Sequence, residues 1–230
     1  MQNSYIEFKD RLIAYRKKVK FSQAKMAKKI GISQSQYCRI EKEDSSVTKD
    51  TFIKMYNKGL DIDFFITGIE RQKTELDKIW KSCPVDKRAE FLGIIVSYIN
   101  MYADDEKAMC KNEIEILKFT LKKANYQTED SIWKCIRTAN DLTQEKMAKL
   151  LGLTKDRYRD IEVGGSDPKV EVLVELYEKL GCYPTLVLEV EANYLLCINK
   201  IWMTLEEKEK EKLIQILKYN LRFIRRNFKH

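Results

Sequence analysis

One stretch of 19 residues occurs twice in this chain, and this repeat constrains the fold more than any other feature. Copy one reads QAKMAKKIGISQSQYCRIE from Gln23 to Glu41, and copy two reads QEKMAKLLGLTKDRYRDIE from Gln144 to Glu162. Internal similarity of this kind indicates that one structural unit is present twice. The 230 residues leave room for two such units, each with its own hydrophobic core.

The repeated stretch has the residue pattern of two short helices joined by a tight turn. The whole chain holds only eight glycines and three prolines, and its apolar residues recur mostly at spacings of three and four, which predicts an all-α fold. Gly31 and Gly152 stand where a left-handed residue would turn the chain between the two helices. Residues that favour helix N-caps precede these helices: Ser22, Ser33, Thr143 and Thr154.

Further helices are expected on both sides of the repeated stretch. Ser4 and Glu7 have the spacing of a capping box, which predicts a first helix from there to about Lys18. Thr128 is expected to open the corresponding helix of copy two. Fourth helices are expected after Thr48 and after Pro168.

Similarity continues beyond these helices, because DKIW at Asp77 to Trp80 returns as NKIW at Asn199 to Trp202. An apolar or amphipathic helix follows in each case. Each copy is therefore expected to contain a helical hairpin, at about 77–102 in copy one and 199–226 in copy two. The apolar faces of these hairpins need burial. The two hairpins can pack together about a pseudo-twofold axis and so replace a subunit interface.

These observations predict five segments along the chain. They are a helix-turn-helix domain at 1–70, a hairpin at 71–102, a connector with one helix at 103–127, a second helix-turn-helix domain at 128–190, and a C-terminal hairpin with a basic tail at 191–230.

The repeated stretch resembles the Cro/cI-like (XRE-type) helix-turn-helix family. The resemblance rests on Ser/Thr-Gln at the start of the second helix, a small alanine, the turn glycine, a Ser/Thr cap and the final Ile-Glu, and it spans roughly residues 4–68 and 128–190. It implies two lambda-repressor-like domains. Copy one departs from the family pattern by lacking the usual Gly and Pro after Ile-Glu, and copy two replaces the closing segment DFFITG with CYPTLVLEV.

The resemblance also implies two classes of DNA contact. In this family the second helix of the pair enters the major groove, while the start of the first helix anchors a phosphate. Phosphate contacts are expected from Ser22, Gln23, Lys28, Thr143, Gln144 and Lys149. Base contacts are expected from Gln34, Ser35, Cys38 and Arg39 in copy one and from Lys155, Asp156, Arg157 and Arg159 in copy two.

The positions expected to contact bases are those that differ between the copies. Glutamine suits adenine, arginine and lysine suit guanine, and aspartate suits the amino group of cytosine, each good pair discriminating by about 1–3 kcal/mol. The two units should therefore read unlike half-sites of double-stranded DNA. The formal charge of +8 and the isoelectric point near 9.0 agree with a polyanionic partner.

Several other functions lack the residues they need. His230 is the single histidine, so histidine acid–base catalysis and Cys/His zinc sites are not expected. The six cysteines contain no CxxC pair and are expected to be reduced core residues. The longest apolar run, 91–102, is too short to cross a membrane. We expect no enzyme activity, no cofactor, no metal and no membrane role.

The sequence thus predicts a cytoplasmic bacterial or phage transcription regulator, a repressor, that reads an asymmetric or pseudo-palindromic operator. Two alternatives remain open at this point. Copy two or the hairpins would instead bind a protein partner, as in antitoxins or inhibitors that also regulate themselves by binding DNA, or both units would be protein-interaction modules. Whether the chain also forms a homodimer is likewise left open.

Overall fold

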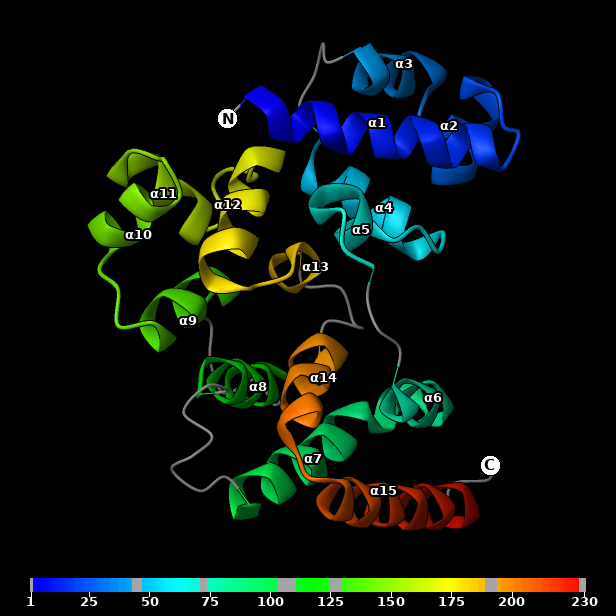
Figure 1. Ribbon diagram of the computed structural model, residues 1–230, viewed down its shortest axis with the longest axis vertical. Coiled ribbons are helices and arrows are strands. Elements are labelled where there is room, and N and C mark those ends of the chain that lie inside the picture. The colour runs from blue at the N-terminus through cyan, green and yellow to red at the C-terminus, as the bar shows by residue number, and fades with distance from the viewer. Residues whose placement is uncertain are drawn as a thin grey trace. The chain divides into compact units, whose positions relative to one another are not determined.

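The computed structural model describes residues 2–42, 47–70, 74–102, 111–124, 130–188 and 194–227. Every regular element in these ranges is a helix, as the scarcity of glycine, proline and strict alternation predicts. The described helices form two compact units, each of which draws on both copies of the repeat (Figure 1). Unit 1 comprises Met1–Arg71 and Thr143–Val190, and unit 2 comprises Gln72–Leu142 and Glu191–His230.

Unit 1 contains both repeated helix pairs and the short helices that close each copy. From copy one it holds α1 (Gln2–Lys18), α2 (Gln23–Ile30), α3 (Gln34–Lys42), α4 (Lys49–Asn57) and α5 (Ile62–Thr67). From copy two it holds α10 (Gln144–Leu150), α11 (Lys155–Glu162), α12 (Val170–Leu180) and α13 (Pro184–Val187). Helix α12 packs against α1 and α5, and α13 packs against α5, so the two copies share one core.

That core is built from the apolar faces that the helical spacing predicts. Phe8 and Leu12 of α1 are fully buried, and the Phe8 ring meets Phe52 of α4 edge to face at 5.9 Å between centroids. In copy two Leu173 and Leu176 of α12 are equally buried. Each such side chain contributes about 1.5–3 kcal/mol when removed from water.

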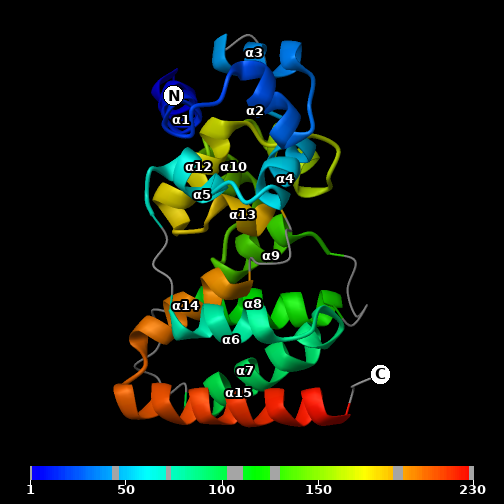
Figure 2. The same ribbon diagram turned by 90° about the vertical axis from the view of Figure 1, so that its right-hand side faces the viewer.

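Unit 2 contains the two hairpins and the connector helix. Its helices are α6 (Glu75–Ser82), the short 3-10 helix η1 (Val85–Lys87), α7 (Arg88–Tyr102), α8 (Lys111–Ala124), α9 (Ile132–Ala139), α14 (Tyr194–Thr204) and α15 (Glu207–Asn227). Helix α7 lies between α8 and α15 (Figure 2) and contacts both. Helix α6 contacts α14 and α15, so the two hairpins do pack together. The first helix of copy two, α9, belongs to this unit and packs on α8.

The first helix of each copy begins at a residue other than the predicted one. Helix α1 begins at Gln2, so Ser4 and Glu7 lie inside the helix and the predicted capping box is wrong. Thr128 lies outside the described residues, but α9 begins at Ile132 with Ser131 as its N-cap, whose hydroxyl accepts from the Lys134 N–H at 3.2 Å. The division of the sequence into five segments stays a prediction. The two compact units group the helices by their contacts in space and not by their order along the chain.

Candidate nucleic-acid interface

In copy one the helix pair α2–α3 has the caps and the turn that its sequence predicts. The Ser22 hydroxyl accepts from the Lys25 N–H at the start of α2, and the Ser33 hydroxyl accepts from the Gln36 N–H at the start of α3. Gly31 adopts a left-handed φ of 87°, and its N–H donates to the Ala27 carbonyl at 2.9 Å. Glycine is favoured there because a side chain would be strained at this φ.

Copy two repeats this arrangement with threonine caps. The Thr143 hydroxyl accepts from the Lys146 N–H at the start of α10, and the Thr154 hydroxyl accepts from the Arg157 N–H at the start of α11. Gly152 again has a positive φ, of 66°. The two helix pairs therefore have the same local construction, as their sequences require.

A buried charge network ties the ends of the helix pair in copy one to α1. The Glu41 carboxylate, at the end of α3, accepts from Arg16 Nε at 2.6 Å and from Arg16 Nη2 at 3.0 Å. It also accepts from Gln23 Nε2, at the start of α2, at 2.6 Å. Burial by itself would raise the pKa of Glu41, but the hydrogen bonds from Arg16 and Gln23 outweigh it and hold the pKa below its ordinary value.

Copy two keeps the corresponding Gln–Glu contact. Gln144 Nε2 donates to the Glu162 carboxylate, which also accepts from the Tyr158 hydroxyl at 3.3 Å. The glutamine and the glutamate shared by both copies are therefore explained by an internal bond that fastens α10 to α11. The same bond fastens α2 to α3 in copy one.

This bond bears on the predicted phosphate contact of the two glutamines. A side-chain amide has two N–H donors, and the bond to the glutamate occupies one of them. In copy one the Gln23 oxygen accepts from the Cys38 thiol at 3.2 Å, so the amide is held in one orientation. The second N–H remains for an anion at the helix N-terminus, and the phosphate role stays a prediction.

Sequence reasoning missed Arg16, although its signal was present. Arg16 and Arg137 are identical residues at equivalent positions before the repeated stretch. Each donates to the carbonyl oxygen five residues later, Arg16 to Phe21 at 3.0 Å and Arg137 to Leu142 at 2.9 Å. An arginine and a glutamate that both copies retain would predict an ion pair once the helices that carry them are placed together.

The residues expected to read bases in copy one mostly lie on the surface of α3. Gln34, Ser35 and Arg39 are exposed. Cys38 is half-buried, and because its thiol donates to Gln23 it contributes to the scaffold. The exposed face of α3 thus presents one amide, one hydroxyl and one guanidinium, and their contact with bases stays a prediction.

The corresponding face of α11 has a different chemistry. Lys155, Asp156 and Arg159 are exposed, while Arg157 is half-buried and donates to the Asp167 carbonyl at 3.3 Å. Helices α3 and α11 thus present unlike exposed side chains on similar scaffolds. Because they carry the residues predicted to contact bases, α3 and α11 are called the reading helices below.

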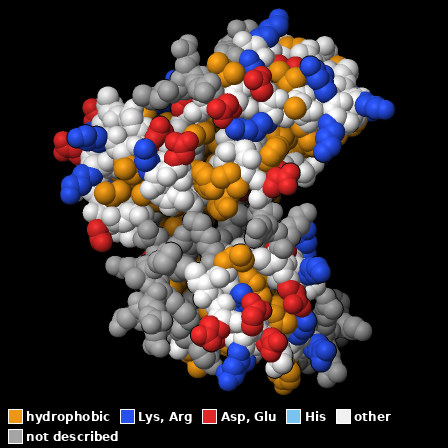
Figure 3. Space-filling view, in the orientation of Figure 1, with side chains coloured by type: hydrophobic (Ala, Val, Ile, Leu, Met, Phe, Trp, Pro, Cys, Tyr) orange, Lys and Arg blue, Asp and Glu red, His pale blue; other side chains and the backbone are white. Residues whose placement is uncertain are grey.

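Basic side chains surround the start of α2. Lysine and arginine side chains gather over the part of unit 1 where α1 ends and α2 lies (Figure 3). The exposed lysines of this region are Lys17, Lys18, Lys20, Lys25 and Lys28. Lys149 is the exposed counterpart of Lys28 on α10. Both predicted anchoring lysines are therefore accessible to a polyanion.

The two helix pairs lie apart within unit 1, with α5, α12 and α13 between them (Figure 1). The loop after α11 reaches copy one, where the Asp167 carboxylate accepts from the Lys49 N–H at the start of α4 at 2.9 Å. The position of α11 relative to copy one is therefore set by packing and by a specific hydrogen bond. Both reading helices therefore have fixed positions within unit 1.

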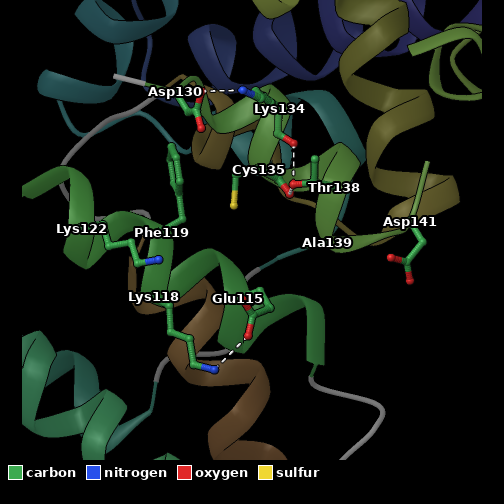
Figure 4. Close-up of a pocket in the computed structure, with 10 residues that line it drawn as sticks. All are labelled: Glu115, Lys118, Phe119, Lys122, Asp130, Lys134, Cys135, Thr138, Ala139 and Asp141. Atoms are coloured by element: carbon green, nitrogen blue, oxygen red, sulfur yellow. Dashed lines mark hydrogen bonds and ion pairs between the residues drawn. The ribbon is translucent and has the colours of Figure 1, made fainter. Parts of the chain in front are cut away.

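A cavity of about 440 Å³ lies between α8 and α9 in unit 2 (Figure 4). Its charges are largely paired, Lys118 with Glu115 at 2.8 Å and Lys134 with Asp130 at 2.7 Å. Burial, aided by the nearby carboxylates, raises the pKa of the Cys135 thiol to about 12. That thiol is therefore protonated at neutral pH and is a poor nucleophile.

Metal ligands and membrane-spanning segments can both be looked for in the positions of the described side chains and helices, 2–42, 47–70, 74–102, 111–124, 130–188 and 194–227. Within them, no three His, Cys, Asp or Glu side chains gather as a metal site would require. No helix of the same residues combines the length and apolar character needed to cross a membrane. Among the described residues, Cys38, Cys83, Cys135 and Cys182 are free thiols.

Comparison with known proteins supports the repeat. The helix-turn-helix family profile matches the chain twice, at residues 12–56 and 136–187. No curated protein and no solved structure shows significant similarity to the chain. Both matched segments contain the capped helix pair and its glycine turn.

Proposed function

Because this chain is a tandem helix-turn-helix protein of the Cro/cI-like (XRE) family, we propose that it reads one asymmetric or pseudo-palindromic operator with both units. The protein is a sequence-specific regulator that binds double-stranded DNA and represses transcription by occupying its site. The observation that carries this proposal is the pairing of two equivalent scaffolds with unlike exposed residues on α3 and α11.

Anchoring and readout are assigned to different residues. The anchoring residues are Ser22, Gln23, Lys28, Thr143, Gln144 and Lys149, at or after the starts of α2 and α10. Helix N-termini favour anions, and the lysines add charge, so these contacts fix the register on the duplex without selecting a sequence. Selection falls to the reading helices.

The chemistry of each reading helix favours a different half-site. Gln34 suits adenine and Arg39 suits guanine in the half-site of copy one, while Lys155 and Arg159 suit guanine in that of copy two. Ser35 is an adaptable donor and acceptor, and Asp156 suits the amino group of cytosine. Cys38 and Arg157 are predicted base contacts as well, and each also makes one hydrogen bond inside unit 1, Cys38 to Gln23 and Arg157 to the Asp167 carbonyl.

The test is selection of bound fragments from random duplex DNA, followed by affinity measurements with variants at fixed salt. Gln34→Ala/Arg39→Ala should lose about 1–3 kcal/mol of discrimination per contact at one half-site, and Lys155→Ala/Arg159→Ala should lose it at the other. Lys208→Ala removes one exposed positive charge from unit 2 and serves as the control. If both pairs of substitutions weaken all sequences equally, direct readout by these helices is wrong.

A second candidate function keeps DNA binding for copy one and gives copy two or the hairpins to a protein partner, as in an antitoxin or inhibitor that regulates itself. Two observations favour it. Asp156 and Asp160 are exposed on α11, where phosphates would repel them. Ile216, Tyr219 and Phe223 are exposed along α15. DNA affinity that is unchanged by Lys155→Ala/Arg159→Ala would favour this function over the first.

A further inference from the structure

Equivalent residues of the two copies meet each other in unit 1. Gly59 and Gly181 end the fourth helix of each copy, both with positive φ, and four residues later stand Asp63 in α5 and Thr185 in α13. The Asp63 carboxylate accepts from the Thr185 N–H at 2.9 Å and from the Thr185 hydroxyl at 2.6 Å. Both residues are buried, at 5% and 3% exposure.

A second equivalent pair meets in unit 2. Asp77 of DKIW and Asn199 of NKIW are 122 residues apart, the same separation as Asp63 and Thr185. Asn199 Nδ2 donates to Asp77 Oδ2 at 3.4 Å, and the Thr74 hydroxyl donates to Asn199 Oδ1 at 2.8 Å. Asp77 and Asn199 are again buried.

Contacts between equivalent residues identify a local pseudo-twofold axis. Under a twofold relation, a residue touches its own equivalent only where the axis passes between them. Helix contacts agree within each unit: α5 touches α13 in unit 1, and α6 touches α14 and α7 touches α15 in unit 2. Each of the two units therefore carries one on-axis pair, consisting of an acid from copy one and a hydrogen-bond donor from copy two.

The chemistry of these pairs discriminates between partners. If copy one packed in the same way on copy one of another molecule, Asp63 would face Asp63 and Asp77 would face Asp77. Two buried carboxylates in contact cannot both remain ionised without a large cost. Asp63 and Asp77 would also lose the hydrogen bonds that copy two donates, although Asp77 would keep its bond from the Thr74 N–H at 2.7 Å. Opposite copy two, each acid instead meets an N–H or O–H group.

We propose that the Asp63–Thr185 and Asp77–Asn199 pairs make the association of the two copies heterotypic, so that copy one accepts copy two and rejects a second copy one. Like charges placed against the wrong partner are an established way to obtain such specificity. One molecule then presents one α3 and one α11, in a fixed arrangement within unit 1. The proposal concerns assembly and does not depend on what the reading helices bind.

The first experiment compares Thr185→Asp with Thr185→Asn in the full chain. The two side chains have similar size, and only aspartate places a second carboxylate beside Asp63. At pH 7 Thr185→Asp should raise the unfolding equilibrium constant at least about 100-fold more than Thr185→Asn does. The swap Asp63→Thr/Thr185→Asp restores an acid–donor pair in reversed order and should recover at least about 10-fold over Thr185→Asp alone.

The same logic applies to unit 2 with a nearly isosteric change, which covers the case in which Thr185→Asp fails to fold. Asn199→Asp should destabilise the chain, and Asp77→Asn/Asn199→Asp should recover stability. Recovery by either swap supports the proposal. Equal stability of Thr185→Asp and Thr185→Asn, or swaps no more stable than Thr185→Asp and Asn199→Asp alone, would overturn it.

Discussion

Replacement of Glu41 by glutamine tests how strongly the buried charge network holds the first helix pair. The Glu41 side chain is 5% exposed and the Arg16 side chain 14% exposed, so the change removes a charge-assisted, two-pronged contact from a nearly dry site. Breaking a fully buried pair costs about 3–5 kcal/mol. Because Arg16 keeps its bond to the Phe21 carbonyl, we expect Glu41→Gln to cost about 2–3 kcal/mol.

The chain offers a matched control on α1, the helix that carries Arg16. Glu7 pairs with Arg11 at 2.7 Å, but its side chain is 51% exposed, and Arg11 also donates to the Phe65 and Ile66 carbonyls. Glu7→Gln should therefore cost only about 0.3–0.5 kcal/mol. The contrast separates a buried network from a surface ion pair of similar length.

Urea unfolding at pH 7 measures both variants. All three tryptophans lie in unit 2, at positions 80, 133 and 202, so fluorescence reports that unit, while far-UV circular dichroism reports helices of both. The Glu41→Gln shift should appear in the circular dichroism transition. If Glu41→Gln costs no more than Glu7→Gln, the network does not fasten α2 and α3 to α1.

Two further predictions concern pH and the turn. Because the folded-state pKa of Glu41 lies below its unfolded value, this group stabilises the fold above about pH 4.5 and loses that contribution as pH falls toward the folded pKa. The free energy of unfolding should therefore fall less steeply with decreasing pH in Glu41→Gln than in the wild type. An equal slope in both proteins would contradict this prediction. Gly31→Ala should lower the free energy of unfolding by about 1 kcal/mol from its positive φ alone, since an added Cβ meets nothing within 4 Å. Gly165→Ala, at a glycine with no positive φ, should change it by less than about 0.5 kcal/mol in the same denaturation assay. Equal costs of the two substitutions would refute the backbone argument.

Local chemistry made much of the fold and part of the site predictable. The caps Ser22, Thr143 and Thr154 and the turn glycines act through bonds to residues three or four positions away, so their signals lie within one short window of sequence. Exposure of Gln34 and Arg39 follows from the same helical period that buries Tyr37 and Ile40. Such features need no knowledge of the tertiary structure.

The predictions from sequence failed, or could not be made, where contacts between residues far apart in the sequence determine the structure. Helix α1 extends back to Gln2, where Tyr5 bonds to the Ile40 carbonyl and Phe8 packs on Phe52, and these contacts outweigh the local preference of Ser4 for a cap. The internal partner of Gln23 is Glu41, 18 residues away, which no cap rule identifies. The presence of this glutamine and this glutamate in both copies indicated that they matter, but not that they bond to each other.

The differences between the copies follow from the loss of exact symmetry. In a homodimer, an on-axis residue meets itself, so only groups that both donate and accept can bond there, and a carboxylate such as that of Asp63 is excluded at neutral pH. Two copies joined in one chain escape this requirement, and an acid in copy one can be matched by Thr185 in copy two. The reading helices escape it equally, because one chain need not present the same side chains twice. Joining two copies in one chain thus permits divergence both on the axis and on α3 and α11, and Asp63, by excluding the homotypic arrangement, keeps α3 and α11 together in unit 1.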